Sequence, residues 1–193
     1  MFSSGRTFSD FISRHRFIWL ILVGALAVAA DQSTKMWAQR TLAERFETTV
    51  ENHTVAHFFA KQEITVIPHL FNFIYKENPA AAFSITLSLP DWFRRPFLLL
   101  VSALATLFFL IWYFRQKEAD GILLTAFCLI MGGAVGNLID RATLGYVIDF
   151  LDFHLGFVGF PNLHWPTFNI ADACIVTGAL TILLRSFSKK EPV

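Results

Sequence analysis

The chain has 193 residues, of which 54% are hydrophobic and only 16% are charged, and its mean hydropathy is +0.50. Because a soluble domain normally carries about a quarter charged residues, this composition excludes an ordinary soluble protein and indicates an integral membrane protein. The formal net charge of +1 does not favour a nucleic-acid partner, and the two cysteines, Cys128 and Cys174, form no C-x-x-C pair that would indicate a metal or redox site.

Four segments are apolar enough to cross a bilayer, which takes about 20 mostly apolar residues. They are residues 17–37, 96–114, 121–139 and 168–187. The third contains Gly132 and Gly136, at a spacing that lets helices pack closely in lipid. The first segment imitates a cleavable signal peptide, but three further spans follow, so we predict that it is retained. A single membrane-embedded domain of residues 1–193 is expected.

Lysine and arginine residues near the ends of the spans predict the orientation in the membrane. Short segments that are dense in positive charge precede the first span, link the second span to the third, and end the chain: Arg6, Arg14, Arg16, Arg115, Lys117, Arg185, Lys189 and Lys190. This pattern places both termini in the cytoplasm. The loops of residues 38–95 and 140–167 then lie outside.

The first outer loop has two parts. Through about Lys61 it is polar and weakly patterned, whereas between residues 64 and 85 Phe71, Phe73 and Tyr75 alternate with less apolar positions before a turn. This alternation predicts short strands in a hairpin at the membrane surface. The second outer loop is rich in aromatic residues from Phe150 to Trp165, which predicts an interfacial segment.

Ionisable residues inside spans are costly and are therefore functional candidates. Here they gather at the predicted outer ends of the spans or just beyond them: Asp31, Lys35, Asp140, Arg141, Asp149 and Asp172, with Asn137 and Asn169 nearby. Asp31 and Lys35 lie one helical turn apart and are expected to share a face. We interpret Lys35 as an interface anchor and Asp140 as the partner of Arg141 or of a helix end.

Several acids at one depth allow two carboxylates to share a proton, which is the chemistry of an aspartic peptidase. The same spacing is equally typical of a proton relay in a transporter or channel. A transporter would also place acids along a path to the cytoplasm, and the cytoplasmic halves of the four spans contain none. The histidines at positions 154 and 164 do not match zinc-ligand spacing, so neither a metal nor another cofactor is expected.

Five strings follow one another in the chain: Asp31-Gln-Ser-Thr-Lys35, Asn78-Pro-Ala-Ala-Ala-Phe-Ser84, Gly132-Gly-Ala-Val-Gly-Asn-Leu-Ile-Asp-Arg141, Val147-Ile-Asp-Phe150 and Phe168-Asn-Ile-Ala-Asp172. Together they resemble bacterial signal peptidase II, the lipoprotein signal peptidase, from Phe17 to about Leu184. The ten-residue block that ends at Arg141 is the most specific of the five. Ala80 stands where the family usually has glycine, which bears on the shape of that loop.

The resemblance implies that Asp149 and Asp172 are the catalytic pair. The motif residues that would shape the site around them are Asp31, Asn78, Asn137, Asp140, Arg141 and Asn169. It further implies an endopeptidase that cuts diacylglyceryl-modified prolipoproteins just before the lipidated cysteine. The implied fold is four membrane helices with a small extracytoplasmic β-cradle and an interfacial segment. We expect a monomer in the bacterial inner membrane, surrounded by lipid, with its active site at the outer leaflet.

Overall fold

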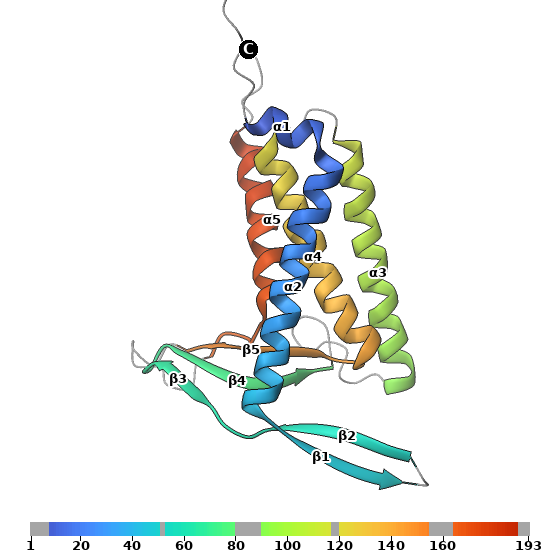
Figure 1. Ribbon diagram of the computed structural model, residues 1–193, viewed down its shortest axis with the longest axis vertical. Coiled ribbons are helices and arrows are strands. Elements are labelled where there is room, and N and C mark those ends of the chain that lie inside the picture. The colour runs from blue at the N-terminus through green and yellow to red at the C-terminus, as the bar shows by residue number, and fades with distance from the viewer. Residues whose placement is uncertain (1–7, 51–52, 80–89, 117–119, 155–163, 189–193) are drawn as a thin grey trace, which may run out of the picture. The chain divides into compact units, whose positions relative to one another are not determined.

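The computed structural model describes residues 8–50, 53–79, 90–116, 120–154 and 164–188, with the backbone alone at residues 8–10, 46–50 and 53–57. These residues form two compact units. Figure 1 labels the helices and strands of both. Unit 1 comprises residues 1–31, 99–139 and 170–193, and unit 2 comprises residues 32–98 and 140–169. The boundary between the units falls within three of the helices and at the start of a fourth.

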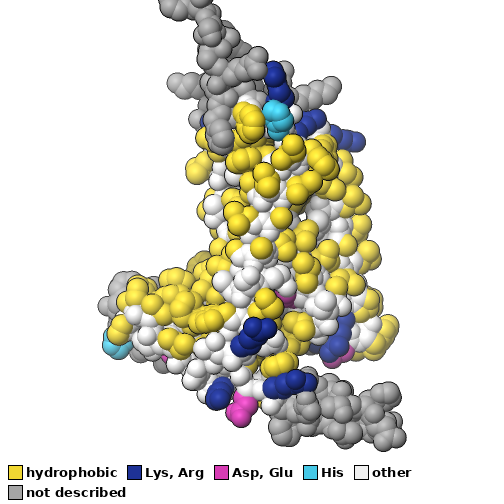
Figure 2. All heavy atoms as spheres, in the orientation of Figure 1, with side chains coloured by type: hydrophobic (Ala, Val, Ile, Leu, Met, Phe, Trp, Pro, Cys, Tyr) yellow, Lys and Arg dark blue, Asp and Glu magenta, His cyan; other side chains and the backbone are white. Residues whose placement is uncertain are grey.

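The helices are α1 (Phe8–Arg14), α2 (Arg16–Leu42), α3 (Asp91–Arg115), α4 (Gly121–Thr143) and α5 (Ile170–Ser188). Within the described chain, α2 to α5 are each long and apolar enough to cross a membrane. The four predicted spans coincide with these helices, so the prediction of four membrane helices with small antiparallel sheets is confirmed. Exposed apolar side chains cover the helices of unit 1 on the face shown in Figure 2, as lipid-facing helices require.

Helix α4 forms the centre of unit 1. Over half of its most apolar stretch is buried, against about a tenth for the other three spanning helices. Its buried residues Leu124, Phe127, Cys128 and Met131 recur at helical spacing and therefore share one face. This face packs with Tyr113 of α3 in the apolar core of the unit.

Glycines bring α2 and α5 close to α4. A Cβ atom added at Gly132 would lie 2.7 Å from the Cβ of Ala27 in α2, and one added at Gly133 would collide with the backbone oxygen of Ala171 in α5. Such contacts leave no room for a side chain. The predicted role of the glycine-rich stretch in helix packing is thus confirmed at Gly132.

Unit 2 contains two antiparallel sheets. In the first, β1 (Ala43–Val50) pairs with β2 (His53–Ala60). In the second, β4 (Phe71–Asn78) lies between β3 (Ile64–Ile67) and β5 (Val147–Phe153). The hairpin predicted from the alternating aromatic residues is confirmed as β3 and β4. Its predicted continuation to residue 85, including Ala80, lies outside the described residues.

Both outer loops hold strands that the sequence did not predict. The stretch from residue 38 to 61, which is weakly patterned in sequence, holds the end of α2 and strands β1 and β2. The aromatic segment predicted to lie in the interface begins with the end of β5, in which Phe150 is buried. Residues 155–163 of that segment lie outside the described part of the chain.

Candidate active site

Asp149 lies on strand β5, whose residues 147–150 are all buried. Only 1% of this residue is exposed, and its two carboxylate oxygens accept hydrogen bonds from two asparagine amides. The Nδ2 atom of Asn78, at the end of β4, donates to Oδ2 at 2.9 Å, and that of Asn169 donates to Oδ1 at 2.7 Å. The Asn169 amide also lies 3.3 Å from the carbonyl oxygen of Ile148. Both oxygens of one carboxylate are therefore held in a fixed orientation.

A second buried carboxylate in unit 2, that of Asp140, joins α2, α4 and β5. Its Oδ2 atom lies 2.9 Å from Nζ of Lys35 and accepts the backbone N–H of Ile148 at 3.1 Å. Its Oδ1 atom accepts from the Gln32 amide at 2.8 Å. Because Ile148 directly precedes Asp149, Asp140 fixes the backbone from which the Asp149 side chain extends.

These contacts correct two expectations. Asp140 forms its ion pair with Lys35 and not, as expected, with Arg141 or a helix end. Lys35 is 2% exposed, so it does not anchor α2 at a membrane surface as expected. Gln32 was not singled out from the sequence, although it belongs to the first motif string. Arg141 is half-buried in the last turn of α4.

In unit 1, the first turn of α5 carries Asp172. The Asn137 side chain on α4 donates to Oδ1 of Asp172 at 2.8 Å. The Oδ1 atom of Asp31, which is completely buried on α2, accepts the backbone N–H of Ala171 at 2.9 Å. Asp31 therefore satisfies one of the amides that an isolated helix start leaves without a partner. The first turn of a helix also favours the negative charge of Asp172.

Each unit thus holds one of the two acids predicted to be catalytic, together with an asparagine that donates to it. Asn78 and Asn169 accompany Asp149 in unit 2, and Asn137 accompanies Asp172 in unit 1. Asn169 and Asp172 are three positions apart along the chain. Since residues in an extended chain span at most about 3.6 Å each, their Cα atoms lie within roughly 11 Å of each other.

Two tyrosines in unit 2 lie close to these residues in sequence. The hydroxyl of Tyr75 donates to Oε1 of Glu77 at 3.1 Å. Burial, together with a hydrogen bond to Tyr146, raises the pKa of Tyr75 far above its usual value. Burial likewise raises the pKa of Tyr146 to about 12. Both phenols are therefore neutral at physiological pH.

A further polar cluster lies on β5 and beyond it. The His164 Nδ1 atom is 3.0 Å from both carboxylate oxygens of Asp152, and the imidazole rings of His154 and His164 stack with their centroids 5.1 Å apart. Among the described residues, no group of three histidine, cysteine, aspartate or glutamate side chains is arranged to hold a metal ion.

The sequence is similar to those of known lipoprotein signal peptidases. The family model for signal peptidase II matches residues 23–188. The chain is 37% identical over 177 residues to the lipoprotein signal peptidase of Oleidesulfovibrio alaskensis, with 92% of this chain and 99% of that protein covered. It is 36% identical over 173 residues to the lipoprotein signal peptidase of Syntrophotalea carbinolica, with 89% and 92% covered.

The fold is also similar to a solved structure described as a bacterial membrane enzyme at 2.3 Å resolution. The TM-score is 0.63 and the sequence identity is 27%, with 90% of this chain and 93% of that chain covered. The sequence and the fold therefore point to the same group of membrane enzymes.

Proposed function

Because the chain belongs to the signal peptidase II family and is therefore a peptidase, we propose that it removes signal peptides from diacylglyceryl-modified prolipoproteins by aspartic catalysis. Asp149 and Asp172 are the proposed catalytic pair. The protein acts as a monomer in the bacterial inner membrane, with both termini in the cytoplasm. Its active site faces the outer leaflet of that membrane.

The observation that carries this proposal is the hydrogen bonding of Asp149. Two asparagine amides hold both of its carboxylate oxygens, and one of them, Asn169, precedes Asp172 by only three residues. A buried carboxylate in this setting is costly unless it has hydrogen-bond donors. The two amides offset this cost and hold both carboxylate oxygens in place, as a catalytic acid requires.

In the proposed reaction, the two carboxylates share one proton. The ionised carboxylate takes a proton from a water molecule while the water oxygen attacks the carbonyl carbon of the scissile peptide bond. The protonated carboxylate donates its proton to the carbonyl oxygen, which gives a gem-diol. This intermediate then collapses: the carboxylate that gave up its proton takes one back from a hydroxyl of the diol, the C–N bond breaks, and the leaving nitrogen takes up the proton that came from water.

The remaining motif residues act as positioning residues. Asp140 and its partner Lys35 set the backbone of β5 beside Asp149, and Asp31 fixes the first turn of α5 that carries Asp172. Asn137 orients the Asp172 carboxylate, and Arg141 contributes to the shape of the site. The scissile bond lies just before the lipidated cysteine, whose acyl chains hold the substrate at the membrane.

The test is a cleavage assay in detergent micelles with a diacylglyceryl-modified prolipoprotein. Asp149→Asn and Asp172→Asn should each abolish cleavage and leave helix content unchanged. Asp152→Asn is the matched control, since this buried acid lies on the same strand but pairs with His164, and it should retain activity. Near-normal turnover by either of the first two variants would refute the proposed pair.

A second arm of the assay tests the substrate. The unlipidated form of the same prolipoprotein should be cut far more slowly, because it lacks the acyl chains that hold the residue after the scissile bond at the membrane. Equal rates on the two forms would contradict the proposed substrate class while leaving the catalytic pair in place.

A further inference from the structure

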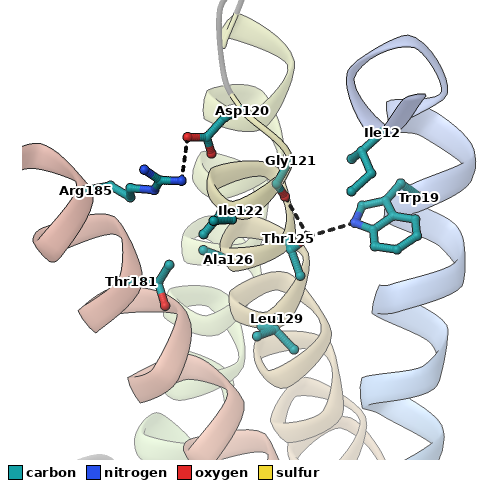
Figure 3. A pocket seen from close by; sticks show the side chains of 10 residues that line it. All are labelled: Ile12, Trp19, Asp120, Gly121, Ile122, Thr125, Ala126, Leu129, Thr181 and Arg185. Carbon is teal, nitrogen blue, oxygen red and sulfur yellow. Dashed lines mark hydrogen bonds and ion pairs between the residues drawn. The ribbon is translucent and has the colours of Figure 1, made fainter. Parts of the chain in front are cut away.

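A groove of about 480 Å³ opens in unit 1 between α2, α4 and α5, at the end of the helices where α1 lies. Figure 3 shows the side chains of α4 lying between Trp19 on one side and Thr181 and Arg185 on the other. The groove is remote from Asp31, which supports the first turn of α5 in the same unit. Trp19 and Asp31 are twelve residues apart on α2, which corresponds to about 18 Å along a helix.

The walls of this groove are apolar because their polar atoms bond to the protein. The Thr125 hydroxyl donates to the carbonyl oxygen of Gly121 at 2.7 Å and accepts the Trp19 indole N–H at 2.9 Å. The Thr181 hydroxyl donates to the carbonyl oxygen of Thr177 at 2.8 Å. An occupant therefore meets hydrocarbon rather than hydrogen-bonding groups, as an acyl chain requires.

Charge lies at the rim of the groove. Arg185 forms an ion pair with Asp120 at 2.9 Å, and both side chains are more than a third exposed. Asp120 also accepts the backbone N–H of Leu123 at 2.8 Å, so it caps the start of α4. A guanidinium group has five N–H donors, and those not used by Asp120 can bind a phosphate.

The surroundings identify the class of occupant. Ile122, which lines the groove, is 55% exposed, and Leu184, beside Arg185 in sequence, is 68% exposed, so the groove opens onto an apolar surface that faces lipid. At this end of the bundle, the described side chains of the helix ends comprise the cations Arg14, Arg16, Arg115 and Arg185 against the single acid Asp120. Such an excess of positive charge attracts anionic lipids.

We propose that this groove binds one anionic glycerophospholipid. One acyl chain packs against Ile122, Ala126 and Leu129, and the phosphate group binds the Arg185 guanidinium beside its ion pair with Asp120. The alternative of an empty groove is unfavourable, since wall atoms that face a void lose their dispersion contacts.

Native mass spectrometry of the purified full-length chain tests the charge recognition, with dioleoyl phosphatidylglycerol titrated against dioleoyl phosphatidylcholine. Arg185→Gln should weaken phosphatidylglycerol binding about tenfold, because it removes a charge-assisted hydrogen bond. Asp120→Asn should strengthen it about threefold, because it removes a repulsive carboxylate and keeps a good helix cap. Arg115→Gln, which removes a charge from the same end of the bundle but outside the groove, is the matched control and should weaken binding far less than Arg185→Gln.

Two substitutions that fill the groove test the acyl-chain site. Thr181→Trp and Ile122→Trp should each remove the bound lipid, and the half-exposed position of Ile122 makes the second substitution compatible with folding. Thr106→Trp is the matched control, because the Thr106 hydroxyl also donates to a carbonyl four residues earlier but lies on α3, outside the groove. Circular dichroism verifies that each variant is folded.

Four results would overturn the proposal. The first is retention of lipid at the normal affinity by the two tryptophan variants. The second is a change of the phosphatidylglycerol affinity in the same direction for Arg185→Gln and Asp120→Asn. The third is equal affinity of the unaltered chain for phosphatidylglycerol and phosphatidylcholine. The fourth is a dimer that Thr181→Trp dissociates, since a second copy of the chain would then occupy the groove.

Discussion

Lys35 of α2 and Asp140 of α4 form an ion pair of 2.9 Å in which neither side chain is more than 3% exposed. Removal of one partner leaves a buried charge without its counter-ion, which costs about 3–5 kcal/mol. Lys35→Met and Asp140→Asn should each lower the free energy of unfolding by about this amount. The double variant should lose clearly less than the sum of the two, which thermal unfolding in detergent measures.

The matched control for this cycle is the exposed pair of Arg95 and Asp91, 3.7 Å apart and more than half exposed. Arg95→Met should cost less than about 1 kcal/mol. Strictly additive effects of the Lys35 and Asp140 substitutions would show that the two charges do not depend on each other.

The amides that hold Asp149 should matter for turnover more than for stability. Asn78→Ala and Asn169→Ala each remove one hydrogen bond to a carboxylate, worth about 1.5–3 kcal/mol. If the lost hydrogen bond stabilises the transition state and not the bound substrate, kcat should drop roughly ten- to hundredfold with little change in KM. Asn72→Ala, on the same strand but in contact with His154, should keep kcat near normal. An equal drop of kcat in the Asn72 variant would mean that such substitutions disturb strand β4 as a whole and do not act through the Asp149 carboxylate.

Gly136 should tolerate no side chain. A Cβ atom there would lie 2.5 Å from Oδ2 of Asp31, the residue that accepts the Ala171 amide. Gly136→Ala should therefore displace this carboxylate, lower stability by about 1–3 kcal/mol, and slow cleavage. Gly24→Ala is the control, because nothing lies within 4 Å of its added Cβ and alanine is the better helix former. Equal behaviour of the two variants in unfolding and cleavage assays would contradict this account.

The raised pKa of the partly buried Tyr146 in unit 2 should limit the stability of the fold in alkali. The folded-state pKa of Tyr146 is raised to about 12, above the value of about 10 in an unfolded chain. Its contribution is therefore complete below pH 10 and is lost as the pH rises through about 12. In unfolding measurements across this range, Tyr146→Phe should show a smaller loss than the unaltered chain. An identical pH profile would count against this contribution.

The sequence predicts the helices well because each apolar run is long enough to span a bilayer. It also predicts the β3–β4 hairpin, since Phe71, Phe73 and Tyr75 alternate. It fails for β5, where Val147, Ile148 and Phe150 are all buried, because a strand covered on both faces shows no alternation. The β1–β2 hairpin was missed because the sequences of its strands, AERFETTV and HTVAHFFA, show no regular alternation of apolar and polar residues.

For the candidate site, sequence strings identify the acids but not their partners. The contact between Asp140 and Lys35 joins residues 105 positions apart (140 − 35), and no local spacing predicts it. Arg141, the neighbour in sequence, was the natural expectation for Asp140. The capping of α5 by Asp31 is likewise a contact between distant segments, formed only when α2 and α5 pack together.

The Lys35–Asp140 pair also constrains how the protein is made. At a synthesis rate of about 5–20 residues per second, the 105 residues from position 36 to 140 take roughly 5–20 seconds to emerge. Throughout that interval α2 exists without its counter-ion, so the lysine must remain in water or among lipid headgroups. The C-terminal end of α2 can therefore reach its final position only after α4 has been inserted into the membrane. Folding of the first span is completed only once the third span is present.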